Sequence, residues 1–354
     1  MTKPEKIRVP AVALRGMVRG MFEKLGAAAE DATVVADVLV WANLRAVDSH
    51  GISRIPRYIE LFASGEAKAR PNIVVTHPKA AVIAVEADGA PGPVAMCRAT
   101  REAIATAAKT GVAWAAVRGT VHTGAIGYYT SEIADAGMIG IGLVAGVPNM
   151  VYAGSKAAGV ATSPIAIAVP SERHGTVMLD MATAVIALGK IAQFRQSGTP
   201  LAPGMALTAA GEPTTDPELA EIPLPLGGAK GSGLSLMIEF LTSVLVGNPI
   251  VAEFHSGTPH GQRHRQNGTV IAVDIGAFGT LAAFRSGIDA AVDAIKALPR
   301  AAGGGEIRYP GERGSRAFTE RNRDGIPIAP GAWQKLCKEA EKLGVGAPAL
   351  TSAG

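Results

Sequence analysis

The chain has 354 residues, 48% of them hydrophobic and 18% charged, which is enough to bury a sizeable core in two or three domains. Its net charge of +4 comes from dispersed Lys and Arg residues, and only 5% of the residues are aromatic. The basic stripe interleaved with aromatics that is typical of nucleic-acid-binding proteins is therefore absent. The 43 Gly residues follow no fixed period, which excludes collagen-like and low-complexity sequence.

The cysteines and the apolar runs predict a soluble, cytoplasmic protein. Cys97 and Cys337 match no metal-binding or redox spacing, as is usual for reduced thiols of the cytosol. The first ten residues, MTKPEKIRVP, lack the apolar stretch of a secretory signal. No apolar run reaches the roughly 20 residues that a membrane helix needs. We therefore expect neither a membrane nor a nucleic-acid partner.

The first 70 residues are predicted to be helical. Apolar residues from Leu14 to Leu25 recur at intervals of three and four, which places them on one face of a helix. A second helix is expected to begin with Asp31 as its N-cap and to end near the DSHG segment, residues 48–51. A third helix covers residues 55–62.

Strands and helices alternate along the rest of the chain. Strands are predicted at residues 72–77, 81–87, 111–117, 139–145, 165–170, 176–182 and 269–275. Helices are predicted at residues 94–109, 234–245, 288–298 and 331–343. Residues 195–225 are expected to form surface loop, and a charged, Gly-rich segment at 303–325 precedes the last helix. Several strands are apolar throughout, which indicates a sheet buried on both faces in an α/β body.

Two Gly-rich motifs bear on phosphate binding. Gly140, Gly142 and Ala145 match the G-x-G-x-x-A form of the dinucleotide fingerprint, but they lie inside a strand-like apolar run instead of between a strand and a helix. A standard Rossmann unit is therefore not predicted. The segment GGAKGSG, residues 227–233, opens a helix whose backbone N–H groups could bind an anion beside Lys230. An exposed lysine at a flexible helix entry is an equally good interpretation of that segment.

Two histidines are candidates for proton transfer, because the ordinary pKa of histidine suits acid–base chemistry near neutral pH. His122 lies among small residues just before a Gly-rich helix start. His50 lies beside Ser49 and precedes Arg54 and Tyr58, which are one helical turn apart. Arg offers a two-pronged contact to a carboxylate. Each histidine taken alone is more simply a hydrogen-bonded loop or helix-cap residue.

A third group of histidines, His255, His260 and His264, does not have the spacing of a known metal site. No cluster of carboxylates accompanies them in the sequence. We therefore predict no metal and expect a solvated or interface loop there.

Six ordered segments together resemble the type-2 malate/L-lactate dehydrogenase family, whose members include ureidoglycolate, sulfolactate, diketogulonate and cyclic imino-acid enzymes. The resemblance extends over essentially the whole chain. The segments are DSHGISRIPRY (48–58), VHTGAIGYY (121–129), ATSPIAIAVP (161–170), LDMATAVIALGKI (179–191), GGAKGSGL (227–234) and ALPRAAGGGEIRYPGE (297–312).

This resemblance implies an α/β fold in which a non-Rossmann nicotinamide-binding domain has a mixed or antiparallel sheet, with helical segments at both ends. It also implies a homodimer or a higher homo-oligomer. The implied division is a helical N-terminal segment (1–70), a small α/β segment (71–118), a cofactor-binding domain (119–280) and a C-terminal segment (281–354) that packs with the N-terminal part.

The same resemblance assigns site residues. His122 is the proton donor and acceptor in ureidoglycolate-type members, and His50 in diketogulonate-type members; the VHTGAIGYY segment favours His122. Substrate-binding roles fall on Ser49, Arg54 and Tyr58. Cofactor-binding roles fall on Thr162, Ser163, Pro164, Asp180, Met181, Ala182, Lys230, Gly231, Pro310, Gly311 and Glu312. Ser163 departs from the family pattern, because members commonly have Asn at this position.

The expected reaction is hydride transfer between a nicotinamide cofactor and a small 2-hydroxy or 2-oxo carboxylate of the malate, lactate, sulfolactate or ureidoglycolate type. NAD is the preferred cofactor and NADP an alternative, because without a Rossmann fingerprint no acidic ribose ligand can be identified. An NADPH-dependent reductase of cyclic imino acids is a second hypothesis. A metallohydrolase that uses the histidines between residues 255 and 264 is a distant third.

Overall fold

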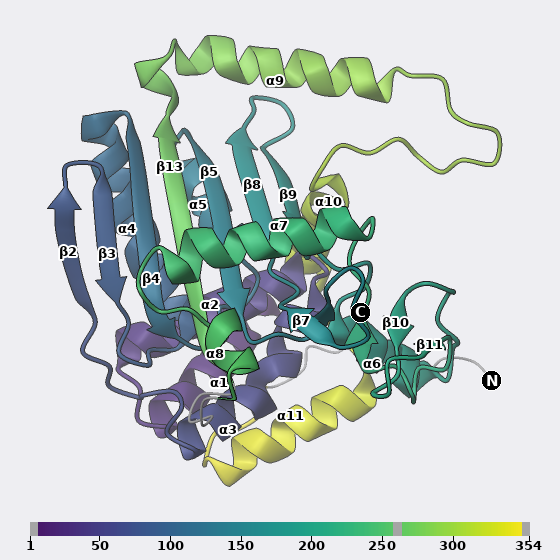
Figure 1. The fold of residues 1–354 in the computed structure, drawn as a ribbon. Coiled ribbons are helices and arrows are strands. Elements are labelled where there is room, and N and C mark those ends of the chain that lie inside the picture. The colour runs from purple at the N-terminus through teal and green to yellow at the C-terminus, as the bar shows by residue number, and fades with distance from the viewer. Residues whose placement is uncertain (1–5, 258–263, 349–354) are drawn as a thin grey trace.

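The computed structural model describes residues 6–257 and 264–348, and a mixed seven-stranded sheet forms its centre (Figure 1). The strand order is β2 (Val74–Lys79), β3 (Val82–Glu86), β4 (Val112–Thr120), β13 (Gln266–Asp274), β5 (Met138–Gly146), β8 (Ile165–Pro170) and β9 (Thr176–Met181). Only β3 and β4 run parallel, and every other neighbouring pair is antiparallel. The predicted mixed α/β architecture is confirmed.

Alternation along the central strands decides how the two faces of the sheet are covered. Val270 and Ala272 of β13 are fully buried on the face packed by α4 (Gly92–Thr110) and α5 (Gly127–Asp135). On the other face, α7 (Ala229–Glu239) crosses the sheet and continues into a π-helical turn, Phe240–Val244 (Figure 1). The predicted strands at residues 139–145, 165–170 and 176–182 correspond to β5, β8 and β9.

The two ends of the chain share one hydrophobic core. Helices α1 (Ala11–Lys24), α2 (Ala29–Leu44), α3 (Ile55–Ala63) and α11 (Pro330–Lys342) contribute to it, and β1 (Ile7–Val9) pairs with β14 (Ile326–Ile328). Phe22, Tyr58 and Trp333 belong to this core. Residues more than 250 positions apart in the sequence are therefore buried together.

Two segments extend from this body. Helix α9 (Leu281–Lys296) lies across the top of the sheet, beyond the end of β13, and a long loop returns from it to α10 (Glu312–Asp324) (Figure 1). A small lobe carries α6 (Leu188–Ser197) and the short strands β10 (Ala206–Leu207), β11 (Pro213–Thr214) and β12 (Ile222–Pro223). The remaining short elements are β6 (Met150–Val151), β7 (Ala158–Val160) and α8 (Val251–His255).

Three local predictions were wrong or incomplete. Helix α2 begins at Ala29, so Asp31 lies inside the first turn and is not the N-cap; its charge still favours the positive end of the helix. Helix α6 begins before the predicted loop at 195–225, and that loop contains three short strands. Helix α10 occupies part of the charged segment 303–325, and Arg321 on this helix pairs with the distant Asp48.

The G-x-G-x-x-A match lies within β5, as the sequence predicted. A side chain at Gly140 would bring its Cβ to 2.7 Å from the carbonyl oxygen of Thr130 in α5, so this glycine permits close helix–strand packing. Among the described residues, no helix combines the length and the apolar character needed to cross a bilayer.

Candidate active site

The structure brings the two candidate histidines together, although 72 positions separate them in the sequence. His50 lies in a short 3₁₀ turn, Asp48–His50, and His122 lies in the loop between β4 and α5. Their rings stack with centroids 5.8 Å apart and planes inclined by 20°. Both side chains remain partly exposed. The pair can therefore meet a ligand from solvent.

Close backbone packing positions the His122 loop. Gly92 begins α4, and a Cβ at this position would lie 2.4 Å from the carbonyl oxygen of His122. The backbone of the next residue, Thr123, makes two hydrogen bonds: its N–H donates to Gln266 Oε1 at 2.9 Å, and its carbonyl oxygen accepts from Tyr129 Oη. The loop is thus tied to two neighbouring elements and to the start of α4.

Tyr58 contacts His122 directly. Its side chain is 0% exposed, and its hydroxyl lies 2.9 Å from the carbonyl oxygen of His122 and 3.1 Å from His122 Nδ1. The family resemblance assigned Tyr58 a role in substrate binding. In the structure this hydroxyl is already occupied by the histidine.

Arg54 and Ser49 complete the cluster. Arg54 Nε donates to the carbonyl oxygen of Ser49 at 2.6 Å, and Ser49 Oγ lies 3.0 Å from His50 Nδ1. Gly189 of α6 packs against both, since its Cβ would lie 2.8 Å from Ser49 Cβ and 3.3 Å from Arg54 Nη2. The turn bearing His50 is held from the other side, because Arg321 donates to the Asp48 carboxylate.

Burial and a nearby cation lower the pKa of both histidines. Burial and then the charge of Arg54 lower the pKa of His50 to about 4. The same two causes, followed by the effect of His50, hold the pKa of His122 well below its ordinary value of 6.5. Neutral imidazoles beside a guanidinium can accept a proton from a substrate that an anionic group anchors.

A second set of predicted residues forms a continuous strip along β9. Ile165 and Ala166 of β8 pair with Met181 and Asp180 of β9, so the 162–164 and 180–182 segments lie side by side. Thr162 accepts at its carbonyl oxygen from the N–H of Thr183 at 3.2 Å. We call residues 162–164, 180–183, 226–231 and 310–312 the cofactor strip, after the role that the family resemblance predicts for most of these segments.

Ser163 is buried within this strip at 2% exposure. Its Oγ lies 3.0 Å from Ser235 Oγ of α7. The hydroxyl of Ser163, where the family commonly has Asn, is therefore hydrogen-bonded to α7. Pro164 and Ala182 beside it remain partly exposed.

Asp180 connects the strip to the histidine loop. Its Oδ2 accepts from the N–H of Gly127, the first residue of α5, at 3.0 Å. Burial raises the pKa of Asp180 to about 6, against the opposing effects of this hydrogen bond and of Arg45. Arg45 donates in turn to the carbonyl oxygen of Gly311 at 3.2 Å.

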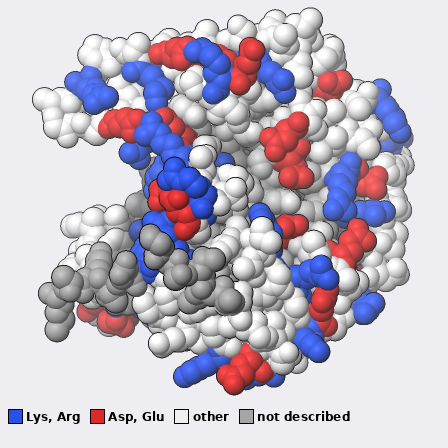
Figure 2. All heavy atoms as spheres, turned by 180° about the vertical axis from the view of Figure 1, so that it is seen from behind, with Lys and Arg blue, Asp and Glu red and all other residues white. Residues whose placement is uncertain are grey.

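The Pro310–Glu312 turn is bonded to β9 through Met178, whose N–H donates to the carbonyl oxygen of Pro310 at 3.0 Å. Glu312 is buried and accepts from Lys296 Nζ and Arg316 Nη2, both at 2.5 Å. These charged side chains belong to the segment around α9 and α10. Figure 2 shows a hollow on one side of the molecule where Lys and Arg gather with Asp and Glu.

Lys230 and Gly231 lie at the other end of the strip, in the first turn of α7. Gly231 is buried against two backbone segments, since a Cβ there would lie 2.5 Å from the carbonyl oxygen of Thr183 and 2.6 Å from Leu226 N. Lys230 is exposed, and its ammonium group makes no ion pair with any described residue. The strip thus ends in a free cation at a helix N-terminus.

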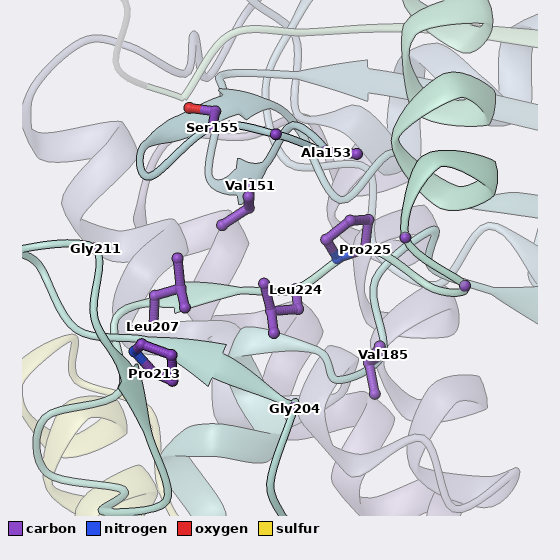
Figure 3. Close-up of a pocket in the computed structure, with 13 residues that line it drawn as sticks. Val151, Ala153, Ser155, Val185, Gly204, Leu207, Gly211, Pro213, Leu224 and Pro225 are labelled. Atoms are coloured by element: carbon purple, nitrogen blue, oxygen red, sulfur yellow. The ribbon is translucent and has the colours of Figure 1, made fainter.

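A cleft of about 670 Å³ adjoins this end of the strip (Figure 3). Gly227 and Gly228, which immediately precede α7, form part of its wall together with Val185, which follows the 180–183 segment. The side chains of Val151, Leu207 and Leu224 turn into it from opposite walls. The cleft is therefore apolar except for Ser155 and the backbone.

Two of the histidines considered for a metal, His255 and His264, contact other groups of the protein. His255 Nε2 lies 2.9 Å from the carbonyl oxygen of Gly159, and His264 Nδ1 lies 2.9 Å from Glu66 Oε2. His260 lies outside the described residues. Within the part of the chain that the structure describes, no group of three or more His, Cys, Asp or Glu side chains is placed to hold a metal ion.

Sequence reasoning missed several residues that shape the site. Arg45 is only 8% exposed and lies between Asp180 and Gly311; a lone Arg at the end of an apolar helix is the signal that could have identified it. Gly92 and Gly189 gave no signal, because only the packing of distant backbone segments makes them necessary.

Comparison with known proteins shows similarity along nearly the whole chain. The family model described as malate/L-lactate dehydrogenase matches residues 9–337. Malate dehydrogenase from Pyrococcus horikoshii is 33% identical over 96% of each chain. L-sulfolactate dehydrogenase from Methanocaldococcus jannaschii is 34% identical over 93% of this chain and 95% of the relative. Ureidoglycolate dehydrogenase (NAD(+)) from Escherichia coli K12 is 31% identical over 94% and 96%.

Solved structures agree in fold. Malate dehydrogenase from Pyrococcus horikoshii OT3 superposes with a TM-score of 0.88 at 30% identity, over 98% of this chain and 99% of the other. Delta1-piperideine-2-carboxylate reductase from Pseudomonas syringae pvar.tomato superposes with a TM-score of 0.82 at 28% identity, over 94% and 99%.

Proposed function

The chain belongs to the malate/L-lactate dehydrogenase family and is a dehydrogenase of hydroxy acids, and from this premise we propose how its site performs the reaction. The enzyme transfers a hydride between a nicotinamide cofactor and the 2-carbon of a small 2-hydroxy or 2-oxo carboxylate. The observation that supports this chemistry best is the stacked pair of neutral histidines beside Arg54.

We propose that the cofactor strip holds the dinucleotide on a mixed sheet that contains no Rossmann unit. The residues present fit an anionic ligand: Lys230 offers an exposed cation at the N-terminus of α7, and Gly231 lets this turn pack closely on the backbone of Thr183 and Leu226. When bound, the nicotinamide supplies the hydride acceptor or donor. Thr162, Asp180 to Ala182 and the Pro310–Glu312 turn would hold the remainder.

Arg54 and His122 handle the substrate in this proposal. The guanidinium of Arg54 keeps donors beyond the Nε that is bonded to Ser49, and it binds the substrate carboxylate. Neutral His122 removes the hydroxyl proton as the hydride leaves, and the imidazolium returns it in the reverse direction. His50, stacked on His122, disfavours a second positive charge, so the pair carries at most one positive charge at a time.

A substrate panel tests the function. We expect binding of NADH, followed as quenching of its fluorescence, and oxidation of one of malate, lactate, sulfolactate or ureidoglycolate with NAD in preference to NADP. The same panel with cyclic imino acids and NADPH separates the second candidate, which the likeness to the piperideine-carboxylate enzyme supports. No turnover of any hydroxy acid with either cofactor would refute the proposal.

We propose further that the enzyme is a homodimer or higher homo-oligomer in the cytoplasm. Helix α7 and the π-helical turn that follows it have one face that points away from the sheet. Neighbouring apolar side chains are exposed on this face. They are Met237 (51%), Phe240 (45%), Val244 (49%) and Leu245 (61%). Such a contiguous apolar row is typical of a protein–protein interface, and the neutral composition of the row suits a second copy of this chain.

Light scattering tests the oligomer. Phe240→Lys with Leu245→Lys should lower the measured mass toward that of one chain. Val12→Lys, at an apolar side chain 79% exposed on α1, is the matched control and should leave the measured mass unchanged.

We also propose that residues 119–280 form the cofactor-binding domain between the small segment 71–118 and the terminal segments 1–70 and 281–354.

A further inference from the structure

The fully buried hydroxyl of Tyr58 has an unusual pair of neighbours, because both belong to the same residue, His122. We infer that Tyr58 is a positioning residue that decides which ring nitrogen of His122 carries the proton, and not a ligand of the substrate carboxylate. This inference rests on the proposed role of His122 as the proton acceptor.

The tyrosine hydroxyl can donate a single hydrogen bond. A carbonyl oxygen can only accept one, so the Tyr58 hydroxyl donates to the carbonyl oxygen of His122 at 2.9 Å. The hydroxyl oxygen is then left as an acceptor, and its other neighbour, His122 Nδ1, is 3.1 Å away. This pair is favourable only when Nδ1 bears a hydrogen.

The consequence for catalysis follows from the chemistry of a neutral imidazole, which has one protonated and one unprotonated nitrogen. With the proton held on Nδ1, the lone pair is on Nε2, the nitrogen farther from the backbone. His122 is then ready to remove a proton from a ligand. When it becomes an imidazolium, the Nδ1–H to Tyr58 bond remains in place.

One competing contact favours the opposite tautomer. The N–H of Gly124 points at His122 Nδ1 from 3.3 Å, and this donor would prefer a lone pair there. It is the longest of the three contacts and comes from the loop itself. If the Gly124 contact prevails, the proton of the neutral His122 ring lies on Nε2, and this result would overturn the inference.

Packing keeps Tyr58 from serving the substrate instead. Its ring meets Phe22 edge-on with centroids 5.7 Å apart and meets His122 with centroids 5.6 Å apart at an interplanar angle of 89°. Tyr58 also belongs to the core shared by the two chain ends. Turning the hydroxyl toward a ligand would break both contacts to His122 and disturb that core.

Tyr58→Phe tests the assignment, since it removes only the hydroxyl. We expect kcat to fall by about tenfold or more, as for loss of one hydrogen bond to a reacting group, with little change in the KM for the carboxylate substrate. A carboxylate ligand would behave in the opposite way, with a raised KM and a nearly constant kcat. That result would contradict the inference.

Tyr129→Phe is the matched control. Tyr129 is equally buried and its hydroxyl donates to the neighbouring carbonyl oxygen of Thr123, so its loss loosens the same loop without touching the imidazole. We expect a smaller fall in kcat than for Tyr58→Phe. Equal losses in the two variants would show that loop anchoring, and not the tautomer, is what matters.

A direct readout comes from ¹⁵N chemical shifts of the His122 ring in protein labelled at histidine. We expect the Nδ1–H tautomer in the wild type and a shift toward Nε2–H in Tyr58→Phe. An Nε2–H wild type overturns the inference even if His122→Ala is inactive. An active His122→Ala with an Nδ1–H wild type would instead refute the proposed function and leave the positioning role standing.

Discussion

The histidine cluster and the cofactor strip are built in different ways. In the cluster, side chains make the contacts: the Tyr58 hydroxyl lies beside His122, Ser49 Oγ lies beside His50, and Arg54 Nε donates to the backbone carbonyl oxygen of Ser49. In the strip, backbone groups and tightly packed glycines form the surface, and its cation, Lys230, has no ion-pair partner among the residues described. The cluster is organised before any ligand binds, whereas the strip has unused donors.

This difference corresponds to the two tasks that we assign. Proton transfer depends on one nitrogen at the correct place, so the surrounding contacts must restrict a ring. Binding of a long anionic ligand depends on many weak contacts along a surface, and backbone N–H groups provide these without losing side-chain freedom. Substitutions of the proton-handling residues in the cluster should therefore change kcat, and substitutions in the strip should change the KM for the cofactor.

The largest effect is expected from His122→Ala. Removing a general acid–base group typically lowers kcat by about 10²–10⁴-fold, and His50→Ala should cost less because His50 acts on the charge of the pair. Steady-state kinetics with saturating cofactor would measure both. A His50→Ala variant impaired more than His122→Ala would exchange the two roles.

Next in size is Gly92→Ala, which alters the packing below the cluster. The new Cβ would lie 2.4 Å from the carbonyl oxygen of His122, so we expect the loop to shift, with a loss of kcat and a lower Tm. Gly16→Ala in α1 is the matched control, since nothing lies within 4 Å of its Cβ.

In the control, alanine should raise stability by roughly 0.5–1 kcal/mol, as is usual for a helix interior. Thermal unfolding and kinetics would be measured on both variants. A Gly92→Ala enzyme with the wild-type Tm and kcat would show that the loop tolerates displacement.

Lys230→Ala should affect the strip alone. Loss of a charge-assisted contact of about 1.5 kcal/mol predicts a roughly tenfold higher KM for the cofactor, with kcat nearly unchanged. Lys109→Ala, at the exposed end of α4, is the control. A fall in kcat with unchanged cofactor KM would place Lys230 in the chemistry and contradict the division between the two regions.

The smallest effect concerns pH and stability, and its sign differs between the regions. Because the pKa of His50 is about 4 in the folded chain and ordinarily 6.5, only the unfolded chain takes up this proton between those values. Stability therefore falls as pH drops from about 6.5 to about 4. His50→Gln should reduce this acid sensitivity, with exposed His77→Gln as control.

Asp180 acts in the opposite direction. Its pKa is about 6 in the folded chain and ordinarily 3.8, so its contribution to stability is present below pH 3.8 and is lost as pH rises through about 6. Asp180→Asn should be more stable than the wild type above pH 6 in denaturant titrations. A variant less stable than the wild type at pH 7 would mean that the ionised carboxylate is required there.

Much of the fold was predictable from local patterns. Strict alternation and apolar runs identified β5, β8 and β9 within a few residues, and the three-four spacing identified α1 and α3. Helices α6 and α10 escaped because their stability comes from contacts with distant segments, such as the ion pair between Arg321 and Asp48. Local periodicity contains no information about such partners.

For the site, the chemical groups and their family could be read from the chain: two histidines, an arginine, a tyrosine and a Lys-bearing helix start, in segments that resemble those of hydroxy-acid dehydrogenases. Their arrangement could not: His50 and His122 stack, the Tyr58 hydroxyl faces an imidazole, Gly92 and Gly189 pack against this cluster, and Arg45 supports the cofactor strip. Residue type fixes what a side chain can donate or accept. Which groups meet, and which are buried enough to shift their pKa, depends on chain segments that are remote in sequence and that packing alone brings together.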